Sequence, residues 1–163
     1  RFYVWVVRGT PLLVQLFVVF YGLPSLGIIL DPFPAAVIVF SINEGAYCAE
    51  TMRAALESVP VGQMEAGYCV GMSYLQVMRR IVLPQALRTA FPPLSNSLIA
   101  MVKDTSLAFV LGIMEMFSQA KALAASQVSM VPFAIAALTY WVFNFVVEML
   151  LGAAEKKLDY YHD

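Results

Sequence analysis

The sequence predicts an all-α integral membrane protein, built as a multi-span helical bundle. Of its 163 residues, 61% are hydrophobic and only 13% are charged, which is more apolar surface than a soluble domain of this size buries. Two stretches, residues 9–30 and 122–147, contain no charged residue at all. Each is long enough to cross about 30 Å of hydrocarbon as a helix. We therefore expect a membrane protein, against the alternative of a fully buried soluble helical core.

Four apolar segments are the predicted spans, at about residues 10–30, 34–56, 89–104 and 131–154. The first is expected to bend or stop near Gly22 and Pro24, and the second to start after the proline-containing segment 31–34. The third is expected to follow the proline pair Pro92 and Pro93, and residues 114–129 are expected to form an amphipathic helix along the membrane boundary. Between the second and third spans lies a polar, glycine-containing loop, residues 60–88.

The basic residues predict the orientation of the chain, because short cytoplasmic loops carry an excess of Lys and Arg. Only Lys121 falls on the opposite side, with Lys103 at the edge of a span. The central loop and the C-terminus are therefore expected to be cytoplasmic. The residues on that side are Arg1, Arg8, Arg53, Arg79, Arg80, Arg88, Lys156 and Lys157.

Several classes of function are disfavoured by composition. The net charge of −1 argues against a nucleic-acid partner, which an excess of unpaired cations would hold. Cys48 and Cys69 lack the spacing of a disulfide framework or metal site, and His162 stands alone in a polar tail. No catalytic residue, metal site or cofactor is therefore predicted. The chain begins at Arg1 without a signal-peptide pattern, so we expect an N-terminally incomplete piece.

The central loop contains a spaced pattern that predicts two short helices joined by a tight turn. Gly71 is expected to supply the turn, Glu65 to lie near the N-terminus of the first helix, and Pro84 to end the element. An apolar stripe is expected to face either a groove on a partner or the protein's own helices. The stripe consists of Met72, Leu75, Met78 and Val82, and the pattern itself consists of Glu65, Ala66, Gly67, Gly71, Ile81, Leu83 and Pro84.

This pattern resembles the EAA loop of ABC-importer permeases, E-A-A, three residues, G, nine residues, I, one residue, L-P. The spacing agrees throughout, and the one departure is Gly67 where alanine is usual. Segments 8–12 (RGTPL), 46–50 (AYCAE), 83–86 (LPQA) and 103–107 (KDTSL) are similar to landmarks of the polar amino acid uptake family. The resemblance covers nearly the whole chain and implies the type I ABC-importer permease fold, here without its first span.

The resemblance also implies a function and partners. The chain would be a multi-pass permease of the bacterial cytoplasmic membrane, surrounded by membrane lipid, that imports polar amino acids. The overall resemblance favours cystine or a similar polar amino acid as the substrate. Its partners would be ATP-binding cassette ATPase subunits, a second permease protomer, identical or not, and an extracytoplasmic solute-binding protein. No phosphate-binding G-x-x-x-x-G-K-[ST] occurs, so ATP hydrolysis is expected in another polypeptide and the chain is not expected to be an enzyme.

Polar residues inside the second predicted span are candidates for the substrate pathway. Asn43, Tyr47 and Glu50, with Glu44, fall on one helix face, and ionisable groups in a span usually face a bundle interior or a water-filled cavity. The first three are expected to line the translocation path. The competing interpretation is a structural Glu50–Arg53 ion pair. Arg8 is expected to anchor at the membrane interface, and Lys103 and Asp104 to form structural pairs with different neighbours.

The leading alternative function is an ATP-independent secondary transporter or channel for small polar solutes. Such a protein would use the same in-span carboxylates for ions or protons but would need no docking loop. The pattern in residues 60–88 favours the ATP-driven class.

Overall fold

The computed structural model describes residues 1–158, in which every regular element is helical. The elements of the N-terminal half are α1 (Phe2–Arg8), α2 (Leu12–Phe17), a π-helical turn η1 (Val18–Gly22), a 3₁₀ turn η2 (Leu23–Leu26), α3 (Pro32–Glu57) and α4 (Val61–Cys69). Those of the C-terminal half are α5 (Tyr74–Val77), the π-helical turn η3 (Met78–Val82), α6 (Leu83–Asp104), the 3₁₀ segment η4 (Thr105–Leu111), α7 (Met116–Gln127) and α8 (Val131–Leu158). The all-α fold predicted from the sequence is confirmed.

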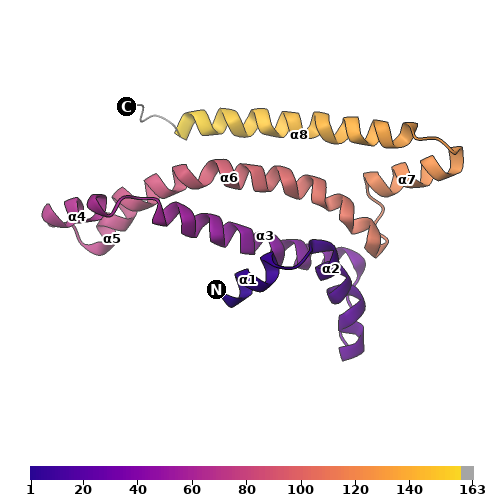
Figure 1. The fold of residues 1–163 in the computed structure, drawn as a ribbon, viewed down its shortest axis with the longest axis horizontal. Helices are drawn as coiled ribbons and strands as arrows, with labels where there is room; N and C mark the ends of the chain where they lie inside the picture. Colours follow the sequence, from indigo (N-terminus) through magenta and orange to yellow (C-terminus); the bar gives the residue numbers. More distant parts are fainter. Residues whose placement is uncertain (159–163) are drawn as a thin grey trace.

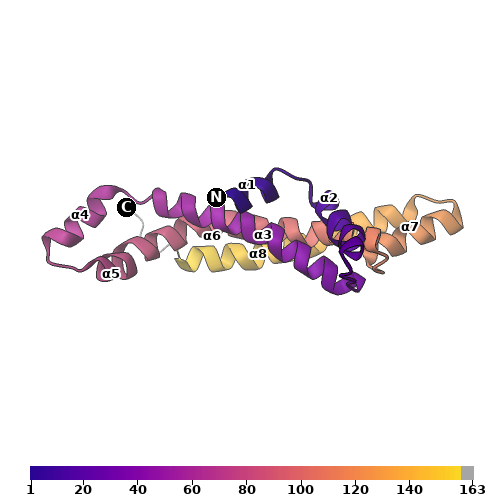
Figure 2. The ribbon, with the colours of Figure 1, turned by 90° about the horizontal axis from the view of Figure 1, so that it is seen from below.

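Three long helices, α3, α6 and α8, lie side by side along the long axis of the molecule. α6 is the central one and packs against both others, while α1 lies across α3. The α4–α5 hairpin projects at one end and the α7–α8 turn at the other (Figures 1 and 2). The chain therefore presents one helical hairpin well away from the rest of the bundle.

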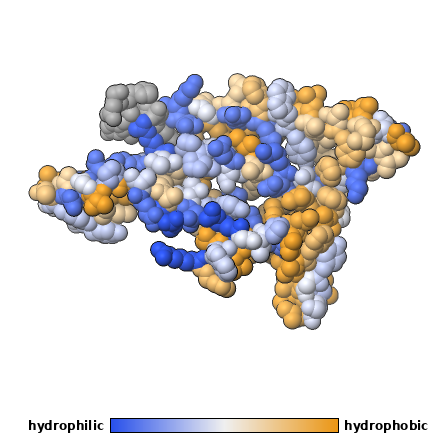
Figure 3. All heavy atoms as spheres, in the orientation of Figure 1, coloured by the Kyte–Doolittle hydropathy of each residue, from blue (hydrophilic) through white to orange (hydrophobic). Residues whose placement is uncertain are grey.

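The bundle is held together by small side chains rather than by a large apolar core. Ala55, Ala86 and Ala90 are buried where α3 meets α6, and alanines allow helices to approach closely. Many large apolar side chains are exposed instead, and Trp141 on α8 is 65% exposed. Figure 3 shows hydrophobic residues over the arm formed by η1, η2 and the first turns of α3. Such a surface requires lipid or another apolar protein surface around it.

The first apolar segment is not one straight helix. α1 and the run from α2 to η2 are bent by 104° at residues 9–11. The α-helix stops shortly before Gly22 and Pro24, where a bend or stop was expected. The π turn η1 and the 3₁₀ turn η2 follow α2, and the helical run ends at Gly27, which has φ +79°. The bend at residues 9–11 was not predicted.

The prediction that the third span would form only after Pro92 and Pro93 is wrong. Both prolines lie inside α6, and the helical run is continuous from Tyr74 to Leu111. Each proline removes one backbone donor. Packing of α6 against α3 and α8 holds the helix together regardless, as neighbouring helices do for prolines within membranes. Pro84 does not end an element either, because the helical run continues from the π turn η3 through Pro84 in the first turn of α6.

Two helical runs are long and apolar enough to cross a membrane, Tyr74–Leu111 and Val131–Lys157. The bent pair Phe2–Arg8 and Leu12–Leu26 adds a third if it is counted as one span. α3 is not among them, so its assignment as a span over residues 34–56 stays a prediction. A helix is present within residues 114–129 as α7, and its position along the membrane boundary stays a prediction.

Candidate functional site

The α4–α5 hairpin has a turn that the sequence predicted correctly. Gly71 has φ +80°, and two backbone hydrogen bonds close the end of α4, from Met72 N to Gly67 O (3.1 Å) and from Gly71 N to Tyr68 O (2.9 Å). This pair of bonds is a Schellman motif, which favours glycine at the left-handed position. The helix after the turn then begins with a reciprocal capping box between Ser73 and Gln76.

Gly67 is the contact point between the two arms of the hairpin. It is buried against Val77 and Ile81, and a Cβ added at Gly67 would lie 2.8 Å from Val77 Cγ2 and 3.0 Å from Ile81 Cδ1. The first distance is shorter than real Cβ contacts show, and the second is tighter than most of them. The glycine at this position therefore lets the two arms of the hairpin approach closely at Val77 and Ile81.

Two expectations about this hairpin are wrong. Glu65 lies in the middle of α4, which begins at Val61 after Pro60 and has no acidic residue in its first turn, so it neither caps the helix nor meets the helix dipole. The apolar stripe is not continuous either. Val82 is buried within the chain while Leu75 is 77% exposed, because the π turn η3 changes the side-chain register between them.

The outer face of the hairpin combines apolar and cationic side chains. Tyr74 and Leu75 are exposed, and a surface hollow of about 400 Å³ is lined by Leu75, Gln76, Arg79 and Arg80. The remaining residues of the pattern, Glu65, Ala66, Leu83 and Pro84, are also exposed. This face suits an apolar groove that carries acidic groups.

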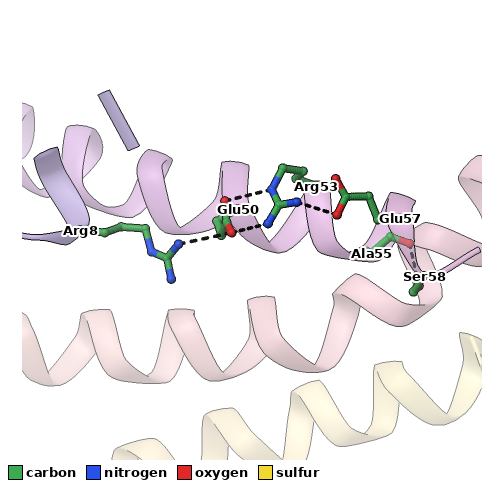
Figure 4. Close-up of polar contacts among 6 residues, drawn as sticks. All are labelled: Arg8, Glu50, Arg53, Ala55, Glu57 and Ser58. Carbon is green, nitrogen blue, oxygen red and sulfur yellow. Dashed lines mark hydrogen bonds and ion pairs between the residues drawn. The ribbon is translucent and has the colours of Figure 1, made fainter. Parts of the chain in front are cut away.

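A second polar site lies where α1 meets α3. Glu50 is the centre of a charge ladder (Figure 4), because its Oε1 lies 3.5 Å from Arg8 Nη1 and 2.6 Å from Arg53 Nη2. Arg53 also donates from Nε to Glu50 Oε2 (3.2 Å) and from Nη1 to Glu57 Oε2 (2.6 Å). The Glu50–Arg53 pair expected under the competing interpretation is thus present, with Arg8 as a third member.

Two adjacent cavities open onto this site and share Arg8, Gly9 and Tyr47 among their lining residues. The larger, about 740 Å³, is also lined by Arg1, Val4, Trp5, Ala49, Glu50 and Arg53. The smaller, about 540 Å³, is also lined by Thr10, Pro11, Leu12, Asn43, Glu44, Ser97, Ala100 and Asp104. Cationic, anionic and hydroxyl groups therefore border one connected region, the chemistry needed to hold a zwitterion.

The structure brings the three predicted pathway residues to these cavities. Tyr47 borders both, Glu50 the larger and Asn43 the smaller. Asn43 also donates from Nδ2 to Gln15 Oε1 at 3.0 Å. Each of the three thus has a partner within the chain as well as a place on a cavity wall.

Arg8 was expected only as an interface anchor, and the sequence reasoning missed its contacts. Its guanidinium carbon lies 5.4 Å from the centroid of the Tyr47 ring, in addition to the ion pair with Glu50. The 104° bend directs α1 onto α3, so no local sequence signal predicts the contact.

The expected structural pairs of Lys103 and Asp104 are not formed within residues 1–158, where neither has an oppositely charged side chain within 4 Å. Asp104 instead borders the smaller cavity. At the end of α6 it shares this cavity with Arg8 of α1 and with Asn43, Glu44 and Tyr47 of α3.

Comparison with known proteins identifies the family. Residues 1–160 match the model of the binding-protein-dependent transport system inner membrane component. The L-cystine transport system permease protein TcyB of Bacillus subtilis (strain 168) is 47% identical over 98% of this chain and 69% of its own length. The permease protein TcyL of the same organism, also of an L-cystine transport system, is 45% identical over 88% of this chain and 67% of its own.

A solved structure shows the same fold. The crystal structure of an amino acid ABC transporter with histidines is 35% identical to this chain, with a TM-score of 0.87 over 95% of this chain and 73% of that one. The type I ABC-importer permease fold is therefore confirmed, as is the expectation of a translocation subunit rather than an enzyme. The chain belongs to the family of inner membrane components of binding-protein-dependent transport systems, as a multi-pass permease subunit.

Proposed function

We propose that this permease subunit carries polar amino acids through an ATP-driven importer and is driven by a separate ATPase that docks on residues 60–88. The observation that carries the proposal is the projecting hairpin, whose exposed face of Tyr74, Leu75, Arg79 and Arg80 is larger than a simple connection between two spans needs. The similar proteins include two L-cystine permeases and an amino acid ABC transporter whose crystal structure was determined with histidines. These relatives support the substrate class.

The distribution of charge supports a cytoplasmic position for the hairpin. The C-terminal end of α8, which carries Lys156 and Lys157, lies toward the same end of the molecule as the α4–α5 hairpin, which η3 with Arg79 and Arg80 follows (Figure 1). Lys121 on α7 lies toward the other end. Under the positive-inside rule, this distribution supports a cytoplasmic position for the hairpin and the C-terminus. A second permease protomer and an extracytoplasmic solute-binding protein complete the proposed machine.

The substrate path is proposed to run through the two cavities at the α1–α3 contact. Tyr47 borders both cavities, Glu50 borders the larger one, and Asn43 and Asp104 border the smaller one. An amino acid carries a carboxylate and an ammonium group, so Arg8 is suited to the first and Glu44 and Asp104 to the second. Because Arg8 is shared with Glu50, a substrate carboxylate would compete for it.

The hairpin proposal is tested by paired variants in the assembled, reconstituted complex. Tyr74→Ala with Leu75→Ala is expected to lower ATP-dependent uptake at least tenfold while the permease stays in the membrane, because removing central apolar anchors weakens a docking interface. Leu123→Ala, exposed on α7 at the far end, is the matched control and should leave uptake unchanged. Uptake is measured with radiolabelled L-cystine, L-histidine, L-glutamine and L-glutamate. Uptake that needs no ATP, or is unaffected by the double variant, contradicts the proposal.

A further inference from the structure

The bend between α1 and α2 leaves a backbone carbonyl without its helical partner. In a continuous helix the N–H of residue 11 would bond to the carbonyl of Val7, but residue 11 is proline and has no N–H. Gln15 takes that place, donating from Nε2 to Val7 O at 2.8 Å. A side chain four residues downstream thus replaces the missing backbone donor.

The other carbonyls at the end of α1 are satisfied in a related way. Gly9 N donates to Trp5 O at 3.0 Å, and the Thr10 hydroxyl donates to Val6 O at 3.0 Å. The same hydroxyl accepts from Gln15 Nε2 at 2.8 Å. The helix end is therefore closed by side chains, which matters because unpaired carbonyls cost several kcal/mol where water is excluded.

Gln15 also ties this corner to α3. Its Nε2 contacts Thr10 O at 3.0 Å, and its Oε1 accepts from Asn43 Nδ2 at 3.0 Å. Both ends of one half-buried amide are thus used, one on the corner and one on the neighbouring helix. The corner residues, Arg8 to Pro11, all border the smaller cavity.

We propose that Gln15 is a positioning residue for transport, holding the Arg8–Pro11 corner against α3 so that the Arg8 guanidinium stays between Glu50 and the cavities. Gln15 itself does not border either cavity, so it acts through Arg8. This inference rests on the proposed substrate path. It assigns a role to a residue that neither the loop pattern nor the polar stripe of α3 includes.

The test is a double-variant cycle in the assembled, reconstituted complex, with uptake KM as the measured quantity. The substrate is whichever of L-cystine, L-histidine, L-glutamine and L-glutamate gives the largest ATP-dependent uptake. Gln15→Leu removes every contact of the amide, and Gln15→Glu keeps its size and the oxygen facing Asn43 but removes the N–H donors when ionised. Each is expected to raise KM on the order of tenfold, because small displacements of a binding group have large effects. Gln119→Leu, exposed on α7, is the control.

Arg8→Gln separates the possible outcomes. If Gln15 acts through Arg8, adding Gln15→Leu to Arg8→Gln raises KM no further, with unchanged amounts of assembled complex. A merely structural role predicts independent, multiplying effects or less assembled complex, and either result overturns the proposal. A wild-type KM for Gln15→Glu overturns it as well. If Arg8→Gln alone leaves KM unchanged, the proposed substrate path fails, and the role of Gln15 fails with it.

Discussion

Glu50 combines a place on a cavity wall with the structural ion pair that the sequence offered as the competing interpretation. It borders the larger cavity and forms a bidentate pair with Arg53. Arg53 keeps a second carboxylate, Glu57, whereas Arg8 has Glu50 as its ion-pair partner among the described residues. Removing the charge of Glu50 therefore affects Arg8 more than Arg53.

Neutralising Glu50 is expected to impair transport in a way that neutralising Glu57 does not. Glu50→Gln leaves Arg8 without its counter-charge. The substrate carboxylate then no longer competes with Glu50 for the Arg8 guanidinium, so uptake KM is expected to change severalfold. Glu57→Gln, at the exposed end of the same ladder, is the matched control. Uptake kinetics of the reconstituted complex check this. Equal effects of the two variants would indicate a general structural ladder with no part in the substrate path.

Within single helices and turns, local residue choice explains much of the structure. The left-handed turn at Gly71 and the helix over residues 32–57 follow from glycine chemistry and from proline in a first turn. The helix through Pro92 and Pro93 does not, because the packing of α6 between α3 and α8 decides it.

The hairpin provides a prediction at the scale of the element. Gly67→Ala is expected to destabilise it by about 1–3 kcal/mol, because the added methyl overlaps Val77 and Ile81. Val77→Ala alone is also destabilising, since it leaves a void. The double variant is expected to be more stable than the sum of the two, because alanine at 67 occupies the space that Val77 vacates. Thermal midpoints of the purified complex measure this, and strictly additive effects would show that the arms do not pack through Gly67.

The candidate site was predictable from the sequence only in part, because packing between helices brings some of its residues together. Asn43, Tyr47 and Glu50 share a helix face, so a polar stripe on α3 indicates them. Arg8 and Gln15 join the site only through the bend at Pro11, which brings α1 and α2 against α3. A contact between residues 28 positions apart, such as Gln15 with Asn43, has no local signature in one sequence.

On the scale of the whole molecule, the two sites lie at different places along one rigid framework. The hairpin projects from one end of α3 and α6 (Figures 1 and 2). The cavities are lined by residues of α3 and of the segment that contains α1. Under the proposed function, a displacement of the hairpin would be transmitted through α3 to the charge ladder, since a continuous helix moves largely as a rigid body. The proposed coupling between an ATPase and the substrate path would then run through α3.

The most direct test of the docking claim is a cross-link from the hairpin tip in the assembled importer. With Cys48 and Cys69 replaced by serine, Leu75→Cys provides a single thiol at an exposed position. We predict that it reacts with reagents added from the cytoplasmic side only, that a short bifunctional reagent joins it to the ATPase subunit, and that the joined complex no longer imports substrate. A thiol that reacts from the outside, or that forms no cross-link to the ATPase in the assembled complex, would contradict the account.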